Sequence, residues 1–338
     1  MPTIKEVAKR AGVSIGTASH VLNGTVPVSE RLRKKVESAV AALDYSPSYV
    51  ARSLATSRTH TIAAVIPDIT NPFFPQVIRG VESIVSKAGY SILTFNTDDR
   101  IEREREALAF LRSRRVDGIL LVIAPGRNSG SHIQGVLNAG IPVVCLDRIP
   151  SGLSVDSVSA DNFGGAKAAV CHLISQGHRD IAILTGPLTL RNARDRLKGY
   201  KTALREAGIP ISPEWVATGD FHEETGARLC RNIFAKGKPW PSAVFASNNL
   251  LMLGALETLA QLGLRCPADV AFVSFDGAIF PDVFRPTITT VVQAAYDIGV
   301  CGAQLLLQRL SNKGHSDPVR IELPTELRIK ESSLLHRG

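Results

Sequence analysis

The chain has 338 residues, of which 44% are hydrophobic and 21% charged, so its composition excludes a disordered protein and predicts packed cores in two or three domains. The net charge of +8 is uneven: residues 1–60 hold nine Lys and Arg against four Asp and Glu, whereas the remaining 278 residues carry only +3. A small basic segment on a nearly neutral body suggests that the segment binds a polyanion.

The cysteines and the N-terminus indicate the compartment. Five cysteines occur singly, without the spacing of metal ligands, and an odd number does not fit a closed set of disulfides. We expect small buried side chains in a reducing cytoplasm, and no metal site. The N-terminus has no secretory signal and no apolar run has the length of a membrane span, so no membrane contact is expected. The cysteines are Cys145, Cys171, Cys230, Cys266 and Cys301.

The stretch TIKEVAKRAGVSIGTASHVL near the N-terminus predicts two short helices joined by a turn at Gly12. Thr3 and Glu6 form a capping box for the first helix, and Ser14 caps the second. Ser29 begins a third helix with its own apolar stripe. Three small helices around one apolar centre are typical of the helix-turn-helix, which places its second helix in the major groove of DNA.

Residues 48–58, SYVARSLATSR, follow Pro47 and predict another short helix. The segment is shorter than the roughly 12–15 residues at which isolated helices become stable. Two interpretations stay open. The segment is either a simple linker or a hinge that orders on DNA and inserts Leu54 into the minor groove.

From Thr61 onwards, short β-branched runs alternate with amphipathic helical stretches, which is typical of parallel sheets covered on both faces. The series restarts after Gln176, so we expect two doubly wound lobes, with the tail from Ile288 to Lys330 crossing back between them. The charge-rich segment 101–115 is interpreted as a solvated helix face. Strands are expected at 62–66, 91–95, 118–123, 143–146, 181–185, near Trp215, 243–246 and 270–275, with a further apolar segment at 155–160. Helices are expected at 73–88, 102–114, 131–139, 166–176, 194–207, 223–235, 251–262 and 298–310.

The loops after these strands contain no dinucleotide fingerprint, P-loop, zinc-protease motif or nucleophile elbow. They contain aromatic rings, carboxylates, amides and guanidinium groups, a mixture that suits a hydroxyl-rich small molecule. No pair among them is an obvious nucleophile and base. The sequence therefore favours ligand binding at the strand ends over catalysis, with no cofactor.

Six segments resemble the lactose and galactose repressor (LacI/GalR) family, in order and over essentially the whole chain: TIKEVAKRAGVSIGTASHVLNG, SPSYVARSLA, IPDITNPFF, RVDGILLV, GHRDIAILTGP and PTITTV. The first two are also similar to the purine repressor branch. The resemblance implies a helix-turn-helix head at residues 1–47, a hinge helix and linker at 48–60, and an α/β effector-binding and dimerisation domain at 61–335. Its two parallel-sheet lobes, of the type I periplasmic-binding-protein kind, are expected at about 61–160 with 292–323, and 161–291 with 324–335.

The resemblance further implies a homodimer that binds a near-palindromic double-stranded operator. Ile15, Gly16 and His20 occupy base-facing positions. Ile15 offers only apolar contact, for instance with a thymine methyl, and Gly16 has no side chain, so His20 is expected to be the main polar reader. No heptad tail follows Glu331, so we expect a dimer and not a tail-mediated tetramer. The expected DNA-binding residues are Thr3, Ser14, Ile15, Gly16, Thr17, His20, Asn23 and, in the hinge, Ala51 and Leu54.

The same resemblance implies an effector site in the body of the protein. Asn249 stands where the family commonly has Asp, and Leu190 where the purine branch has a base-reading Arg, and both departures argue against a purine. The implied effector-binding residues are Phe73, Phe74, Asp147, Arg148, Arg196, Phe221, Asn248, Asp276 and Gln293.

Four arginines suggest a finer hypothesis about the effector. A cluster of Arg148, Arg191, Arg194 and Arg196 would favour a carboxylated or phosphorylated sugar through bidentate contacts. The alternative is that Arg191 and Arg194 lie on an exposed helix start. The sequence leaves both open.

These features predict a transcriptional repressor, not an enzyme, whose operator affinity is controlled by a sugar-like effector. The effector binds two conformations of the lobes unequally and thereby disorders the hinges. The alternatives are a cytoplasmic sugar-binding or sugar-processing protein with an incidental basic head, and a family member that activates or needs a corepressor.

Overall fold

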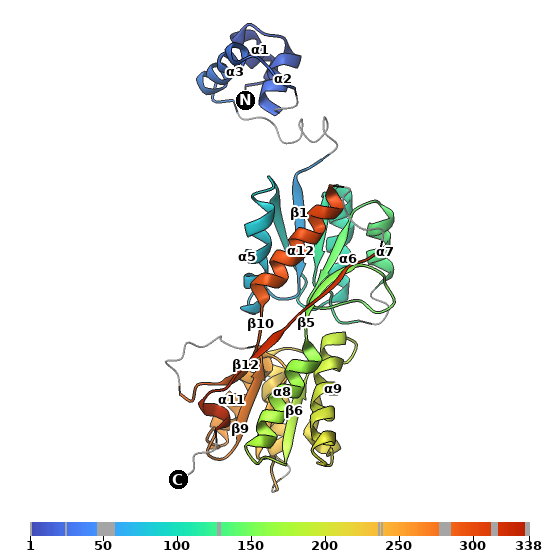
Figure 1. Ribbon diagram of the computed structural model, residues 1–338, viewed down its shortest axis with the longest axis vertical. Coiled ribbons are helices and arrows are strands. Elements are labelled where there is room, and N and C mark those ends of the chain that lie inside the picture. Colours follow the sequence, from blue (N-terminus) through green and yellow to red (C-terminus); the bar gives the residue numbers. More distant parts are fainter. Residues whose placement is uncertain are drawn as a thin grey trace. The chain divides into compact units, whose positions relative to one another are not determined.

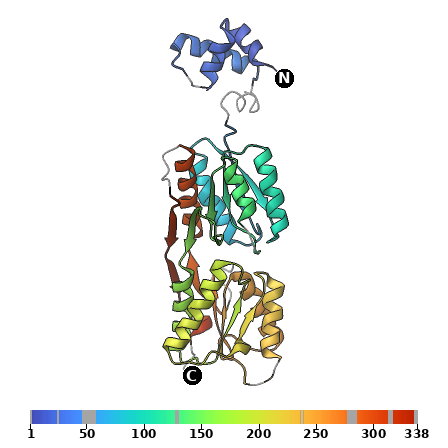
Figure 2. The same cartoon turned by 90° about the vertical axis from the view of Figure 1, so that its right-hand side faces the viewer.

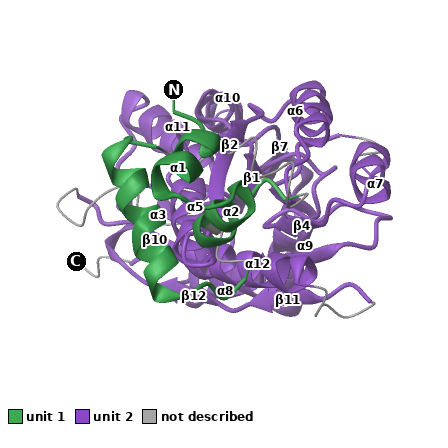
Figure 3. Ribbon diagram, turned by 90° about the horizontal axis from the view of Figure 1, so that it is seen from above, with its two compact units in different colours: residues 1–60 green, residues 61–338 purple. Residues whose placement is uncertain are grey.

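The computed structural model describes residues 2–23, 26–45, 58–126, 130–235, 237, 239–276, 285–311 and 317–334. The chain forms two compact units, Met1–His60 and Thr61–Gly338, which Figure 3 colours separately. The expected hinge helix, with Ala51 and Leu54, lies outside the described residues apart from its last residue, Arg58.

The first unit consists of three helices around a small apolar core. They are α1 (Ile4–Ala11), α2 (Ile15–Asn23) and α3 (Glu30–Ala42), as the sequence predicted. Because so small a core buries little apolar surface, hydrogen bonds that satisfy the helix ends also contribute to stability here. The buried side chains are those of Val7, Ala8, Ala11, Ala18, Val36 and Ala39.

The predicted helix caps are present in this unit. The Glu6 carboxylate accepts hydrogen bonds from the backbone N–H and the hydroxyl of Thr3, at 2.7 and 3.0 Å. Gly12 ends α1 with a φ of +64°, a conformation that costs glycine little. The Ser14 hydroxyl accepts from the backbone N–H of Thr17 at 3.0 Å and so caps α2. These contacts fix where the second helix begins, and hence which of its side chains point outwards.

The second unit contains two six-stranded sheets, each with helices on both faces (Figure 1). Lobe 1 is built on the sheet with strand order β11-β5-β4-β3-β1-β2, and all of its strand pairs are parallel. Its strands are β1 (Thr61–Ile66), β2 (Ser91–Asn96), β3 (Gly118–Leu121), β4 (Val143–Leu146), β5 (Asp156–Ala160) and β11 (Arg320–Leu323). Its helices are α5 (Phe73–Val85), α6 (Ile101–Ser113), α7 (Ser131–Asn138) and α12 (Ala295–Leu310).

Lobe 2 is built on the sheet with strand order β12-β10-β9-β8-β6-β7, in which only β12 is antiparallel to its neighbour. Its strands are β6 (Ile181–Thr185), β7 (Val216–Thr218), β8 (Ala243–Ala246), β9 (Ala271–Phe275), β10 (Thr289–Gln293) and β12 (Thr325–Arg328). Its helices are α8 (Asn162–Ser175), α9 (Arg191–Glu206), α10 (Glu223–Phe234) and α11 (Asn249–Gln261). The 3-10 turns Pro213–Trp215 and Glu331–Ser333 complete the described elements.

The C-terminal tail crosses between the lobes, as expected. β10 lies in the sheet of lobe 2, α12 packs on α5 in lobe 1, β11 pairs with β5, and β12 returns to β10. These crossing segments run along one side of both lobes in Figure 2. The lobes are therefore joined by several segments of the chain, all on one side.

Two expectations need correction. The segment 101–115 is not only a solvated face, because α6 buries Ala107, Leu108, Leu111 and also the carboxylate of Glu104, which is hydrogen-bonded to Ala124 N and to His132 Nε2. The helix packs one side against the sheet. The hydrogen bonds of Glu104 to Ala124 N and His132 Nε2 offset the cost of burying its carboxylate there. The cysteines are all free thiols, but only Cys145 and Cys230 are buried, whereas Cys266 and Cys301 are half-buried and Cys171 is exposed. Among the described helices, none is both long and apolar enough to cross a membrane.

Candidate functional site

The second helix of the first unit presents the predicted base-reading positions to solvent. Ile15 is 48% exposed, although it is a large apolar residue, and Gly16 and His20 are also exposed. A Cβ on Gly16 would meet only the Ser14 hydroxyl, at 3.7 Å, so packing does not require a glycine there. Ile15 therefore takes no part in the apolar core of this unit and is accessible to a partner. Thr3 and Ser14 are exposed and Thr17 half-buried, and the Asn23 side chain lies outside the described residues.

In the second unit, most predicted effector residues meet at the carboxyl ends of the strands. Asp147 and Arg148 follow β4 of lobe 1, whereas Phe221 precedes α10 of lobe 2. Arg196 lies on α9, Asp276 follows β9, and Gln293 ends β10. All of these side chains are buried except that of Asp276, which is 12% exposed.

Asp147 is a buried carboxylate whose hydrogen-bonding capacity is only partly used. Its Oδ2 accepts from Asn192 Nδ2 at 3.3 Å and lies 3.9 Å from Arg148 Nε, while Oδ1 accepts no hydrogen bond from any described residue. Burial raises the pKa of Asp147 to about 6, against the opposing effect of Arg196 and Arg148. This carboxyl group is therefore suited to accept a hydrogen bond from a ligand.

Arg148 is held from lobe 1 and faces lobe 2. Its Nη1 and Nη2 donate to the two carboxylate oxygens of Asp99, the second at 3.4 Å, and Nη1 also donates to the carbonyl of Ile123 at 3.2 Å. The guanidinium lies over the ring of Phe221, with 5.6 Å between its carbon and the ring centroid. Burial lowers the pKa of Arg148, but the neighbouring carboxylates, Asp99 first, outweigh it and shift the pKa upwards.

Arg196 ties together the strand ends of lobe 2. Its Nε donates to Asn162 Oδ1 at 2.8 Å and its Nη1 to the carbonyl of Ser247 at 2.6 Å. Asp276 lies 3.7 Å from Nη1 and accepts a further hydrogen bond from Gln293 Nε2. Burial raises the pKa of Asp276, opposed by Arg196 and by that hydrogen bond.

Several buried polar atoms at these strand ends have no hydrogen-bond partner within the described part of the chain. Buried polar groups normally find a partner, so atoms without one at a strand end indicate a place for a ligand. Both lobes contribute such atoms, and lobe 2 does so at β6 and β8, where its strand order reverses. The atoms are Asp147 Oδ1, Arg148 Nε, Thr185 Oγ1, Ser247 Oγ and Gln293 Oε1.

Three of the predicted residues make packing or positioning contacts. Asn248 uses its Oδ1 to cap α11, accepting from Leu251 N at 2.9 Å, and its Nδ2 to donate to the carbonyl of Phe221. Phe73 and Phe74 pack edge to face, 5.2 Å between ring centroids, within the apolar core of lobe 1. Asn248 therefore positions Phe221, and the two phenylalanines stabilise the start of α5.

The four arginines considered in the sequence do not converge. Arg191 and Arg194 are exposed at the start of α9, where Arg191 pairs with Asp195 at 3.2 Å and Arg194 donates to the carbonyls of Leu188 and Thr189. The alternative of an exposed helix start thus describes these two residues. Of the four, only Arg148 and Arg196 belong to the buried cluster at the strand ends, which also contains Asp99, Asp147 and Asp276.

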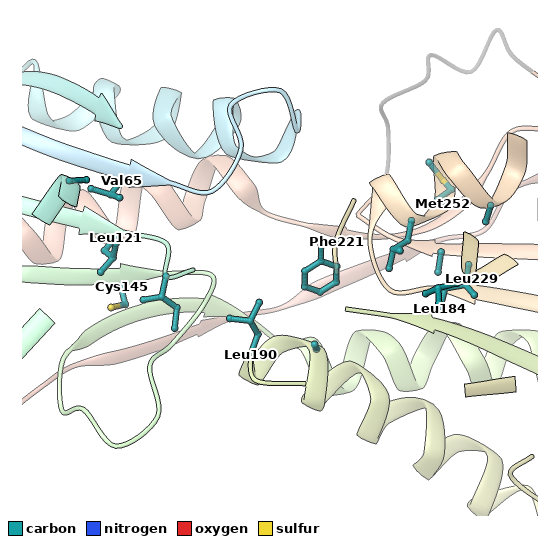
Figure 4. Packing of buried hydrophobic residues seen from close by; sticks show 14 of the residues in the cluster. Val65, Leu121, Cys145, Leu184, Leu190, Phe221, Leu229 and Met252 are labelled. Atoms are coloured by element: carbon teal, nitrogen blue, oxygen red, sulfur yellow. The ribbon is translucent and has the colours of Figure 1, made fainter. Parts of the chain in front are cut away.

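Apolar contacts also cross between the lobes. Phe221 and Leu190 lie between the buried groups of lobe 1 and lobe 2 in Figure 4. Phe221 packs directly on Gly186, where a Cβ would come within 2.4 Å of the ring. The glycine after β6 therefore creates the space for this aromatic side chain.

The sequence did not identify several polar partners of this site. Asn71 and Asn249 hydrogen-bond to each other from opposite lobes, and Asp99 holds Arg148. Asn71 lies in the segment IPDITNPFF that carried the resemblance, so a signal existed for it. For Asp99, which lies 49 residues from its partner, nothing in the sequence indicated the pairing.

Family models match both parts of the chain. The model described as bacterial regulatory proteins, lacI family, matches residues 3–48, and that of a periplasmic binding protein-like domain matches residues 170–333. Among curated relatives, the HTH-type transcriptional repressor PurR of Histophilus somni (strain 129Pt) is 35% identical over 332 residues, 98% of this chain and 99% of the relative. The ribose operon repressor of Halalkalibacterium halodurans is 36% identical over 333 residues, 98% of this chain and 97% of the relative.

Solved structures give the same result. The lac repressor dimer bound to operator and the anti-inducer ONPF matches with a TM-score of 0.86 and 27% identity, over 99% of each chain. The complex of the transcriptional regulator CelR with cellobiose matches with a TM-score of 0.74 and 33% identity, over 98% of this chain and all of the other. Both the helical unit and the two-lobed unit are thus shared with these proteins, and the chain belongs to the lacI family of bacterial regulatory proteins.

Proposed function

We propose that this protein is a sequence-specific DNA-binding transcriptional repressor whose operator affinity is controlled by a small sugar-like effector. The observation that carries the proposal is the pairing of two features in one chain. An exposed helix presents Ile15, Gly16 and His20, and a buried polar cluster leaves hydrogen-bonding atoms unused at the strand ends. The first suits the major groove and the second a hydroxyl-rich ligand.

The similar solved structures support a DNA partner, a sugar partner and a dimeric assembly. One similar structure is a dimer on its operator, and another holds cellobiose. We extend these properties to this chain as a homodimer that binds double-stranded DNA and a sugar. Since its DNA partner is in the bacterial cytoplasm, we place the protein there.

A sugar fits the site better than a purine. Leu190 is 1% exposed and lies between the lobes, so it offers a base only an apolar contact. Asn249 has both of its amide atoms engaged, with Asn71 and with Leu250 N. Neither residue supplies a free polar group that would read a base.

We propose a binding protein and not an enzyme. Burial raises the pKa of Cys230 and Cys266 to about 12, and burial likewise raises that of Cys145, so these thiols are poor nucleophiles at neutral pH. The charged groups of the cluster are paired with each other, and the polar atoms that remain unused are suited to hydrogen bonding.

The experiment is a selection of DNA from a random pool by the full chain, followed by gel-shift titration of the selected duplexes. Ile15→Glu places a carboxylate against DNA without touching the core and should abolish the retained binding, whereas Leu262→Glu, at an equally exposed leucine of the second unit, should leave it unchanged. Enrichment of no sequence, or equal binding by both variants, would contradict the proposal. A thermal-shift screen of sugars then identifies effectors, each tested for its effect on the gel shift.

A further inference from the structure

The buried cluster contains more carboxylates than cations. The ionisable groups that act electrostatically on Asp147 are Arg196, Arg148, Asp276 and Asp99. The described part of the cluster therefore holds three carboxylates against two guanidinium groups. An anion entering here would face an excess negative charge in a region of low dielectric, where repulsion is strongest.

Both guanidinium groups are already engaged. Arg196 is held by Asn162, by the carbonyl of Ser247 and by Asp276, and it stacks on the ring of Phe275 at 3.7 Å. Arg148 is held by the Asp99 carboxylate at both of its terminal nitrogens. Bidentate capture of a ligand phosphate or carboxylate needs those terminal nitrogens, and neither arginine presents a free pair of them.

The atoms that remain are mostly hydrogen-bond acceptors and hydroxyls. Asp147 Oδ1 and Gln293 Oε1 accept, Thr185 and Ser247 contribute hydroxyls, and only Arg148 Nε is a pure donor. Acceptors of this kind need O–H donors on the ligand. A neutral polyol supplies several O–H groups, and a phosphate supplies mainly acceptors.

We infer that Asp99 masks Arg148 and thereby restricts the effector site to uncharged, hydroxyl-rich ligands, excluding sugar phosphates and sugar acids. This inference rests on the proposed effector site. In this inference Asp99 affects specificity without contacting the ligand. It belongs to the turn after β2 and influences the site through the Arg148 guanidinium that it neutralises. Removal of its charge leaves the terminal nitrogens of Arg148 without a carboxylate partner, and of the described carboxylates only Asp147, 3.9 Å from Nε, still pairs with the guanidinium.

The chain offers a matched control at the next residue. Asp98 lies in the same turn, and its φ of +51° resembles the +56° of Asp99. Its carboxylate pairs with Arg103 and is 47% exposed, whereas that of Asp99 is 10% exposed against Arg148. Asp98→Asn therefore makes the same chemical change in the same turn without altering Arg148.

The test measures binding of matched neutral and anionic probes by isothermal titration of the full chain. The probes are D-ribose with D-ribose 5-phosphate, D-glucose with D-gluconate, and inorganic phosphate alone. The wild type should show no binding of the anionic probes. Asp99→Asn should bind at least one of them roughly tenfold to a hundredfold more tightly than Asp98→Asn does.

A second variant shows whether the gain passes through Arg148. In the double variant Asp99→Asn/Arg148→Met the anion binding should disappear. The inference is overturned if the wild type binds an anionic probe as tightly as its neutral counterpart, or if Asp99→Asn binds anions no better than Asp98→Asn. Gel shifts on the same preparations without sugar report DNA binding separately, so failure of the DNA-binding function is recognised independently of the titrations.

Discussion

Asn71 of lobe 1 and Asn249 of lobe 2 donate to each other, at 3.2 and 2.8 Å, although 178 residues separate them in the chain. The orientation of the Asn71 amide is fixed, because its Oδ1 also accepts from Phe73 N at 3.1 Å. The pair joins the starts of α5 and α11, one helix from each lobe. It therefore stabilises the conformation in which the lobes are close.

Asn249→Asp should weaken this contact. The variant loses one hydrogen bond and places a carboxylate oxygen against Asn71 Oδ1, at a cost of about 1–2 kcal/mol, or a roughly five- to thirtyfold loss of effector affinity. Hydrogen–deuterium exchange should be faster in peptides covering residues 69–75 and 247–252. Asn138→Asp is the control, because Asn138 accepts a hydrogen bond from Gln134 at the exposed end of α7. Unchanged exchange at both segments would show that the amide pair does not hold the lobes.

The sequence predicted the strands better than the helix starts. The central strands of both sheets are completely buried, so they appear as continuous apolar runs that are easily recognised. In contrast, α8 begins four residues before the expected position, within a segment that contains Gly164 and Gly165. Its start is fixed by the Asp161 side chain, which accepts from Gly164 N at 2.6 Å.

For the site, the sequence predicted residues but not their pairing. Asp147 and Arg148 are adjacent and were expected together, whereas the partner of Arg148 depends on a turn in which Asp98 and Asp99 both have positive φ. Glu104 was taken as solvated because its partner His132 lies on a different helix. Long-range ion pairs of this kind follow from topology, which hydrophobic periodicity does not specify.

Gly186→Ala should impair effector binding and spare DNA binding. The added methyl would come within 2.4 Å of the Phe221 ring, so the ring must shift from its position under the Arg148 guanidinium. We expect a loss of effector affinity of about tenfold, since overpacking costs on the order of 1–3 kcal/mol. Isothermal titration and gel shifts measure the two activities.

The control for this variant is Gly135→Ala. Gly135 lies on α7, and a Cβ there would meet only Arg112 Nη1 of α6, at 3.8 Å. It should leave both activities unchanged. Equal effector affinity in Gly186→Ala and Gly135→Ala would show that the position of Phe221 does not matter for binding.

Ile15→Ala should relax the base preference at one operator position. The exposed side chain offers only apolar contact, and the base with a complementary methyl group is thymine. Loss of that contact should cost about 1 kcal/mol for operators carrying thymine there and little for others. The measurement is a binding-site selection with wild type and variant at one salt concentration. A uniform loss across all sequences would identify Ile15 as a general contact and not a base reader.

Asp147 should make effector affinity depend on pH. Its pKa of about 6 is raised by burial, with Arg196 and Arg148 opposing and Asp276 and Asp99 adding to the shift. An ionised carboxylate accepts hydrogen bonds from ligand hydroxyls more strongly than a neutral acid does. Effector affinity should therefore fall about tenfold as the pH is lowered from about 7 to about 5. Isothermal titration of the wild type and of Asp147→Asn measures this, and the variant should show no such slope.

The same shift should affect the stability of the ligand-free protein with the opposite sign. A carboxyl group whose folded pKa lies above its unfolded value of 3.8 binds more protons in the folded state. The free energy of unfolding therefore falls as the pH rises from about 4 to about 6, and the deficit then stays constant. Denaturant titrations of wild type and Asp147→Asn across this range isolate the contribution, because every other group is shared. A difference between the two proteins that does not change with pH would show that Asp147 ionises normally, and the predicted slope in affinity would fail with it.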